Sequence, residues 1–363
     1  MSEAKILKAK CEKHGLYFGM ELKESRGQYR VTNMIRITEE EAGIICSEVR
    51  QSVFETAPNL VPCHRCGNRK LGGCSCAPRA HSCSADMKYH FDCIYCKHFR
   101  VDYTRTGRVP YGEWAGVTNI PGAIKDKYGN PQGGQYDLMA DGSMKGYRVI
   151  VFLLYDGMTF NSPRAALERK GFEVLEYRIS SLPTPAQLSQ LLEVGKTQIW
   201  VISDCTARLN SGHVDVICDF FHRGGGVYIW GDNEPYYVDA NTILGKLFST
   251  EMYGDVPGGK VIGVRSGDSG GGIRPDHPIT TALANFYEGI TIATVKLTQG
   301  LEPLFWGSAG NLVCAYYDTD GCRALVDGGF TRLYCNWDTA GTDRYVVNAA
   351  AWLANMERFG YLG

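Results

Sequence analysis

The sequence predicts an α/β protein: a parallel β-sheet covered by helices on both faces, preceded by a small zinc-stabilised α+β module. From about residue 147 onward, continuous apolar runs alternate with helix-like segments, which is typical of buried parallel strands. Before about residue 103 the chain is instead rich in cysteine. The sequence therefore predicts a cysteine-rich module at 1–103, an irregular connector at 104–146 and an α/β domain at 147–363.

Length and composition fit two packed domains. The 363 residues are 44% hydrophobic and 11% aromatic, which is ample for hydrophobic cores. A net charge of −1 gives no general attraction to nucleic acid or anionic membranes, although residues 1–105 carry seventeen Lys and Arg against twelve Asp and Glu. No apolar run approaches the roughly eighteen residues needed to span a bilayer, and the N-terminus lacks a signal-peptide core, so we expect a cytoplasmic protein.

The N-terminal module begins with two strand-like runs, at 16–22 and 28–37, which we expect to form a hairpin. A helix is predicted at 42–53, because Thr38 and Glu41 have the spacing of a capping box. Cys46 lies on this helix without a partner at metal-ligand spacing, and we interpret it as a small buried residue.

Cysteine spacing in this module predicts zinc. Nine of the fourteen cysteines lie between Cys11 and Cys96, and two C-x-x-C pairs about thirty residues apart are typical of tetrahedral zinc sites in a reducing compartment. The ligands are enough for two ions, with one to spare. One division groups the first four ligands and leaves Cys83, Cys93 and Cys96 with either Cys74 or Cys76, but spacing alone leaves the pairing open. The predicted ligands are Cys11, His14, Cys63, Cys66, Cys74, Cys76, Cys83, Cys93 and Cys96.

These ions are predicted to be structural, because a catalytic zinc keeps an open position for water, whereas a surplus of thiolates closes the shell. The run from Cys63 to Cys96 resembles TerY-C, the metal-binding module of von Willebrand A proteins in tellurite-resistance and stress operons. The resemblance implies an accessory zinc-binding module in a multi-protein system, with no chemistry of its own.

The connector at 104–146 has no regular period and is rich in Gly, Pro and Asn. Its aromatic residues, among them Trp114 and Tyr136, argue against free disorder, so we expect it to lie pinned across one or both domains.

The α/β domain reads as four successive strand and helix units. Strands are predicted at 147–155, 172–179, 198–203 and 226–230, with helices between them at 164–170, from 185 onward and at 211–223. Ser162 is the expected N-cap of the first helix, and Thr184 with Gln187 forms a capping box for the second. The glycines at 224–226 end the third helix.

Acidic residues follow these strands, and ligands of parallel sheets bind at the carboxyl ends of the strands. Converging carboxylates would suit a divalent cation or a polyhydroxylated ligand. The alternative is that these short polar residues only end strands and cap helices, and the sequence leaves the two interpretations about even. The residues concerned are Asp156, Asp204, Cys205, Asp232, Asn233, Glu234 and the later Asn336-Trp337-Asp338.

The order of strands, helices and corner, with His277 and the later segment 348–353, resembles the class I glutamine amidotransferase-like superfamily, closest to its ThuA-like branches. The resemblance covers most of 147–355 and implies a flavodoxin-like doubly wound sheet. In true amidotransferases the corner holds a cysteine nucleophile, completed by a His-x-Glu pair. Here the corner is Gly231-Asp232-Asn233, and His277 precedes Pro278, so glutaminase activity is not expected.

Two further features belong to this domain. Cys205 could face the same crevice with His213 as its base, but we interpret it as a buried structural cysteine. The run Gly267–Gly272 lacks the lysine of a phosphate-binding P-loop and is interpreted as a surface loop, with Arg265 and Arg274 beside it as a hint of anion binding.

The leading functional hypothesis is a zinc-binding two-domain protein whose amidotransferase-like domain, a pseudoenzyme, binds a protein partner or a small polar ligand. The alternative is a hydrolase or isomerase of a small polar substrate, with candidate catalytic residues Asp204, Cys205, Asp232, Glu234 and His277. Nucleic-acid binding is not expected, because the module lacks a recognition helix or a basic stripe.

Overall fold

The structure is a computed structural model. It describes residues 5–11, 17–25, 28–37, 55–56, 71–73, 81–83, 90–92, 99–101, 111–267, 270–319, 321–337, 340–359 and 361–362. The chain divides into two compact units, Met1–Arg105 and Thr106–Gly363. The segment 106–146, predicted as a separate connector, therefore belongs to the same unit as the α/β domain.

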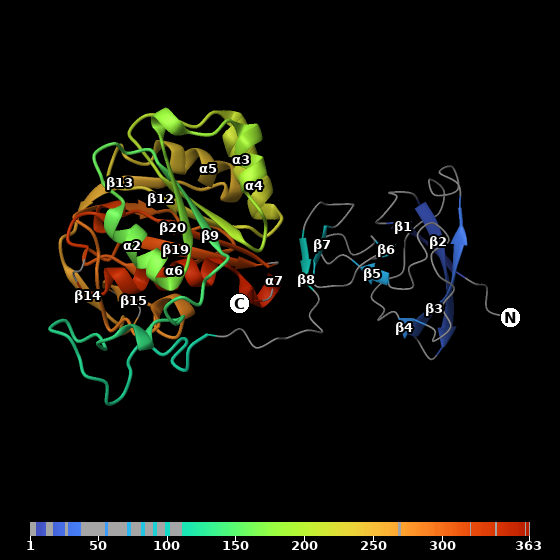
Figure 1. The fold of residues 1–363 in the computed structure, drawn as a ribbon, viewed down its shortest axis with the longest axis horizontal. Helices are drawn as coiled ribbons and strands as arrows, with labels where there is room; N and C mark the ends of the chain where they lie inside the picture. Colours follow the sequence, from blue (N-terminus) through green and yellow to red (C-terminus); the bar gives the residue numbers. More distant parts are fainter. Residues whose placement is uncertain are drawn as a thin grey trace. The chain divides into compact units, whose positions relative to one another are not determined.

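The described part of the first unit is built of short strands (Figure 1). The predicted hairpin corresponds to β2 and β3, which pair antiparallel. One sheet has the order β4-β3-β2-β1-β6-β5, and β7 pairs with β8 separately. The strands are β1 (Lys5–Cys11), β2 (Tyr17–Ser25), β3 (Gln28–Arg36), β4 (Glu55–Thr56), β5 (Leu71–Gly73), β6 (His81–Cys83), β7 (His90–Asp92) and β8 (Phe99–Val101).

Two of the predicted zinc ligands fall on this sheet. Strands β1 and β6 run parallel, and their register places Cys11 opposite Cys83. The predicted helix at 42–53 lies outside the described residues. So do the other seven predicted ligands, which are His14, Cys63, Cys66, Cys74, Cys76, Cys93 and Cys96.

The second unit is organised around an eight-stranded sheet with the order β10-β9-β11-β12-β20-β19-β18-β15. The first five strands are parallel and the last three are antiparallel to their neighbours. The predicted α/β class with a mostly parallel sheet is confirmed. The strands of this sheet are β9 (Arg148–Leu153), β10 (Glu173–Arg178), β11 (Thr197–Ile202), β12 (Gly226–Trp230), β15 (Gly272–Ile273), β18 (Leu301–Trp306), β19 (Leu312–Thr319) and β20 (Cys322–Asp327).

Two small ladders lie outside the main sheet. One pairs β13 (Met252–Pro257) with β17 (Thr291–Val295), and the other pairs β14 (Val261–Gly263) with β16 (Asn285–Tyr287). The α-helices are α2 (Asn161–Lys170), α3 (Pro185–Leu191), α4 (Ser211–His222), α5 (Val238–Phe248), α6 (Thr342–Leu353) and α7 (Met356–Phe359). Short 3-10 helices span Gly134–Tyr136, Ile179–Ser181, Pro278–Thr280 and Phe330–Leu333.

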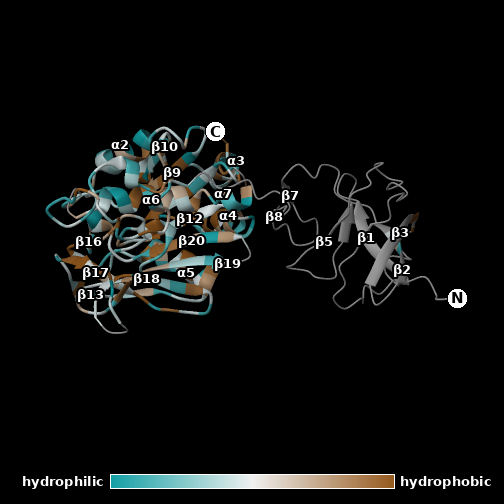
Figure 2. Ribbon diagram, turned by 90° about the horizontal axis from the view of Figure 1, so that it is seen from below, coloured by the Kyte–Doolittle hydropathy of each residue, from teal (hydrophilic) through white to brown (hydrophobic). Residues whose placement is uncertain are grey.

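Helices cover both faces of the main sheet (Figure 1). Along β9, Val149, Val151 and Leu153 pack in the core that includes residues of α2 and α6. Their neighbours Ile150 and Phe152 point to the other face and pack in the core that includes α3, α4 and α5. Hydrophobic stretches recur along these strands in Figure 2, so two apolar layers enclose the sheet.

Two predicted boundaries are wrong. Helix α2 begins at Asn161, so Ser162 lies inside its first turn and is not the N-cap. Strand β20 ends at Asp327, so Asn336 and its neighbours follow a 3-10 helix and do not end a strand. The capping box at Thr184 and Gln187 is present at α3, as predicted.

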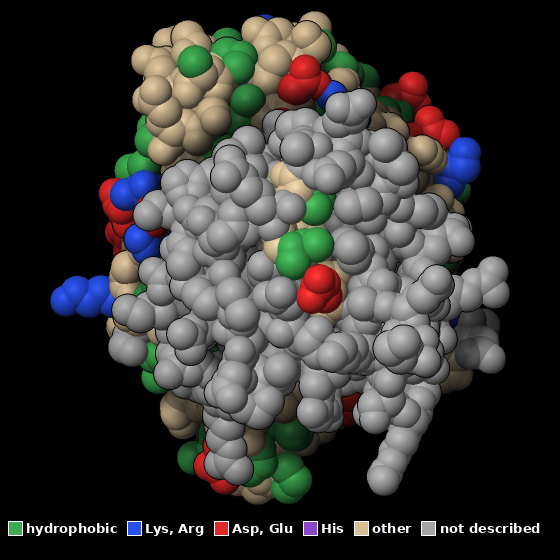
Figure 3. All heavy atoms as spheres, turned by 90° about the vertical axis from the view of Figure 1, so that its right-hand side faces the viewer, with side chains coloured by type: hydrophobic (Ala, Val, Ile, Leu, Met, Phe, Trp, Pro, Cys, Tyr) green, Lys and Arg blue, Asp and Glu red, His purple; other side chains and the backbone are tan. Residues whose placement is uncertain are grey.

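The segment 111–146 has little regular structure but packs on the α/β domain. Leu138 and Met144 are buried in one of its two cores. The Leu138 N–H donates a 2.8 Å hydrogen bond to the side chain of Asn348 on α6. The visible surface of the second unit carries basic and acidic side chains interspersed with hydrophobic ones (Figure 3), as the near-neutral net charge leads us to expect.

Candidate functional site

The carboxyl ends of β9, β11, β12 and β20 carry the loops where a ligand site is expected. Because these strands are parallel and adjacent, their following loops emerge at the same edge of the sheet. The loop after β12 turns sharply at Gly231, where a Cβ atom would lie 2.5 Å from the sulfur of Met252. Only glycine fits this corner without displacement, so the chain reaches Asp232 in a fixed direction.

Asp204, at the end of β11, forms an ion pair with Arg208. The Arg208 Nε and Nη2 atoms donate to Asp204 Oδ2 at 2.9 and 2.8 Å, and the Cys205 N–H donates to Oδ1 at 2.8 Å. The hydrogen bond from Asp204 raises the pKa of Arg208. Both oxygens of this carboxylate are therefore engaged in holding their own loop.

Asp232 is 1% exposed at the end of β12. The Asn233 N–H donates to its Oδ1 atom at 3.0 Å, and Thr331 hydrogen-bonds to it through its backbone and its side chain. Burial raises the pKa of the Asp232 carboxyl well above its usual range, although these hydrogen bonds and Arg332 act in the opposite direction. A carboxyl group in this state can hold a proton near neutral pH.

Three tyrosines from three different loops meet beside Asp232, and we call Tyr155, Tyr236 and Tyr334 the tyrosine cluster. The ring of Tyr155 lies 5.4 Å from that of Tyr236 and 6.1 Å from that of Tyr334, centroid to centroid. A hydrogen bond joins the side chains of Tyr155 and Tyr334. All three are half-buried, so the cluster presents aromatic surface and hydroxyl groups at the strand ends.

Cys335 follows this cluster directly. Its thiol is free and half-buried. Burial raises the pKa of the Cys335 thiol, and the nearby Asp232 carboxylate adds to the effect. The thiol is thus poorly ionised at neutral pH, which is unfavourable for a nucleophile.

The remaining sequence candidates lie apart from this group or point to solvent. Cys205 is exposed, so its interpretation as a buried structural cysteine is wrong. The ring of His213 faces the Pro183 carbonyl, with Nε2 2.8 Å from that oxygen, and does not serve as the expected base. Glu234 is exposed, and its backbone N–H donates to the Gly254 carbonyl.

His277 lines a different pocket, of about 420 Å³, with Tyr316, Arg323 and Trp352. Its ring lies 4.4 Å from that of Tyr316 and 5.4 Å from that of Trp352, centroid to centroid. The His277 Nδ1 atom accepts a hydrogen bond from the Ile279 N–H at 3.2 Å. Burial, with Arg323 and Arg274, lowers the pKa of His277 to about 3, so the ring is neutral at physiological pH.

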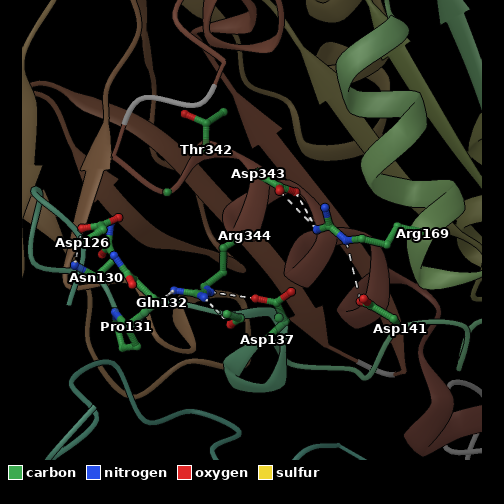
Figure 4. Close-up of a pocket in the computed structure, with 13 residues that line it drawn as sticks. Asp126, Asn130, Pro131, Gln132, Asp137, Asp141, Arg169, Thr342, Asp343 and Arg344 are labelled. Carbon is green, nitrogen blue, oxygen red and sulfur yellow. Dashed lines mark hydrogen bonds and ion pairs between the residues drawn. The ribbon is translucent and has the colours of Figure 1, made fainter. Parts of the chain in front are cut away.

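A further polar pocket of about 440 Å³ lies between the segment 126–141 and the start of α6 (Figure 4). Arg344 lies across it, donating to Asp137 at 2.7 Å and to the carbonyl groups of Pro131, Ala282 and Gly133. In the same view Arg169 pairs with charged neighbours on either side. These charges are already paired, so the pocket mainly fastens the segment to the α/β domain.

The described residues hold neither a metal-binding group nor a membrane-spanning helix. Among them, no three His, Cys, Asp or Glu side chains are grouped as a metal site requires. Within the same part of the chain, every helix is too short or too polar to cross a membrane.

Sequence reasoning missed Thr331, Tyr334 and Cys335. They were overlooked because the strand was expected to continue to Asn336, which hid a loop. The pair Gly328-Gly329, directly after the apolar run of β20, is the signal that would have placed the strand end correctly.

No family model and no curated protein matches this chain. Among solved structures, the N-terminal domain of mmIFT52 is 13% identical at a TM-score of 0.43, covering 57% of this chain and 97% of that one. A cytoplasmic protein from Salmonella typhimurium LT2 is 10% identical at 0.41, covering 58% and 99%. A putative GMP synthase protein from Thermoplasma acidophilum is 8% identical at 0.34, covering 57% and 94%.

Proposed function

We propose that this chain is a zinc-binding, two-domain protein whose α/β domain is a pseudoenzyme of the amidotransferase-like type. In this proposal the domain binds a protein partner or a small polar ligand at the carboxyl edge of the sheet, as part of a stress or defence system. The strand order β10-β9-β11-β12-β20 supports the flavodoxin-like part of the proposal, since it follows the order 2-1-3-4-5 among the parallel strands.

The tyrosine cluster is the observation that carries the binding function. Tyrosine combines a large, rigid apolar ring with a hydroxyl group, and such residues supply much of the binding energy at recognition surfaces. Three of them converge from three loops at the edge where ligands of parallel sheets bind. Meanwhile Asp204 is paired with Arg208 and no cysteine occupies the corner after β12, which supports binding without turnover.

The test of binding compares variants of the full-length protein in affinity capture from extracts of the source cells. A specific protein or ligand retained by the wild type should be reduced at least about tenfold with Tyr155→Ala and Tyr236→Ala, since aromatic anchors contribute about 2 kcal/mol or more. Tyr253→Ala is the matched control, because Tyr253 is exposed on β13, outside the cluster. Equal retention by all three variants would exclude the cluster as the binding surface.

One observation favours the alternative, a hydrolase or isomerase: Asp232 is a buried carboxyl group with a raised pKa next to Tyr334 and Cys335. Purified protein should therefore be screened with amide, ester and glycoside substrates. The binding hypothesis expects no turnover above that of Asp232→Asn. Turnover that Asp232→Asn abolishes would establish the enzyme instead.

A further inference from the structure

A basic pocket lies at the far edge of the main sheet, three strands from β20 in the sheet order. It has a volume of about 350 Å³ and lies at β15 and β18. Pockets of this size are typical of small-ligand sites. Its lining residues are Arg265, Gly267, Arg274, Pro275, Pro303 and Trp306. We call it the Arg265–Arg274 pocket.

Backbone packing fixes the position of its walls. The Arg265 N–H donates to the Ile273 carbonyl at 2.9 Å, and the Arg274 N–H donates to the Leu304 carbonyl at 2.8 Å. Gly271 allows this close approach, because a Cβ atom there would lie 2.4 Å from the Gly307 carbonyl oxygen. The two arginines are thereby held on either side of the edge strand.

The guanidinium group of Arg265 stacks on Trp306. Its central carbon lies 3.5 Å from the centre of the indole ring, which is close for a cation–π contact. Stacking holds the planar group as one wall of the pocket and restricts its rotation. The positive charge therefore has a defined location.

Arg274 is held loosely by comparison. Its side chain is 42% exposed, and its Nη1 atom lies 3.4 Å from Glu302 Oε2 and 3.5 Å from the Pro303 carbonyl oxygen. Charge-assisted hydrogen bonds are normally about 2.7–2.9 Å long. A stronger acceptor that entered the pocket would therefore compete well for this guanidinium group.

From these contacts we propose that the Arg265–Arg274 pocket binds the phosphate group of a small phosphate monoester. Two guanidinium groups supply two positive charges, and none of the described lining residues carries a carboxylate. A phosphate monoester is close to doubly negative at neutral pH and offers three acceptor oxygens, so it matches both charges better than a carboxylate does. The concave, proline-flanked shape suits one small group rather than an extended polymer.

The test is calorimetric titration of the full-length protein with glycerol phosphate and with inorganic phosphate at constant ionic strength. We expect saturable binding by the wild type, and a dissociation constant about tenfold or more higher for Arg274→Gln, as for the loss of a hydrogen-bonded charge. Arg265→Lys keeps the charge but loses the planar stack, and should also weaken binding. Arg148→Gln is the control, because it removes the same charge from an exposed pair on β9.

Three results would overturn the proposal. The first is no saturable binding by the wild type up to about 10 mM, the range of weak affinities. The second is equal weakening by Arg148→Gln and Arg274→Gln, which would indicate general charge attraction. The third is binding of vesicles containing phosphatidic acid, or of an oligonucleotide, without binding of glycerol phosphate.

Discussion

At the residue scale, a fully buried ion pair shapes the loop that follows β20. Asp327 and Arg332 are both 0% exposed and bond to each other. The Tyr345 hydroxyl donates to Asp327 Oδ2 at 2.8 Å, and Tyr228 donates to the Tyr345 hydroxyl at 2.7 Å. Arg332 also donates to the Glu288 carbonyl. This network positions the segment that carries Tyr334 and Cys335.

Breaking this pair should destabilise the second unit strongly. Arg332→Met leaves the Asp327 carboxylate buried without its countercharge, which costs about 3–5 kcal/mol. Denaturant unfolding followed by tryptophan fluorescence measures the change. Lys296→Ala removes an exposed partner of Glu251 and should have little effect. If the two variants were equally stable, the buried pair would not be the constraint that we describe.

His277 makes the stability depend on pH. Its pKa is lowered from 6.5 to about 3, so below pH 6.5 the unfolded chain binds a proton that the folded chain does not. The contribution is absent above pH 6.5, and the free energy of unfolding falls by up to about 1.4 kcal/mol per pH unit as the pH drops toward 3.

The measurement is denaturant unfolding between about pH 7 and pH 4 for the wild type and His277→Gln. The stability difference between them should change with this slope. The comparison is needed because Asp232, whose pKa is raised, acts in the opposite direction: its contribution is lost as the pH rises above its unfolded value. A pH-independent difference between the two proteins would show that His277 is not held neutral by burial.

At the element scale, two helix starts differ in a way that can be measured. The Thr184 hydroxyl caps α3 by accepting from the Gln187 N–H at 3.3 Å, and the Gln187 side chain accepts from the Thr184 N–H at 2.9 Å. Ser162 makes no such bond, because it lies inside α2. Thr184→Ala should therefore cost about 1 kcal/mol of unfolding free energy, whereas Ser162→Ala should change it little. Thermal unfolding of both variants checks this, and the reverse ranking would restore Ser162 as the cap.

The same pair of helices shows what local sequence can predict. Capping boxes and apolar runs depend on near neighbours in the chain, so β9, β11, β12, α3 and α4 lie where the pattern placed them. Ser162 was misleading because Ser-Pro fits both an N-cap and the first turn of a helix.

The candidate site was harder to predict, because its contacts join distant segments. Asp232 meets Thr331, and Tyr155 meets Tyr334, over separations that no local pattern records. The sequence placed Asp204 and Asp232 at strand ends, but the ion pair with Arg208 and the burial of Asp232 follow from three-dimensional packing alone. Residue type at a strand end therefore indicated where to look, and packing decided what each carboxylate does.

At the scale of the whole molecule, the two units should respond differently to loss of metal. The second unit has two large hydrophobic cores. The first is rich in predicted thiolate ligands, and folding of small zinc modules depends on the metal. We expect about two zinc ions per chain by elemental analysis, as two four-ligand sites would hold. Chelation should unfold the first unit while the second keeps its thermal transition, and loss of both transitions together would contradict this.

The register of β1 and β6 sharpens the prediction. Neighbouring strands lie about 4.8 Å apart, so the backbones of Cys11 and Cys83 are close enough to supply one ion. We therefore expect the double variant Cys11→Ser/Cys83→Ser to lose one zinc ion per chain, no more than Cys83→Ser alone. Cys205→Ser, which alters an exposed cysteine of the second unit, should keep the full zinc content. A loss of two ions in the double variant would instead assign the two cysteines to separate sites, as spacing alone had suggested.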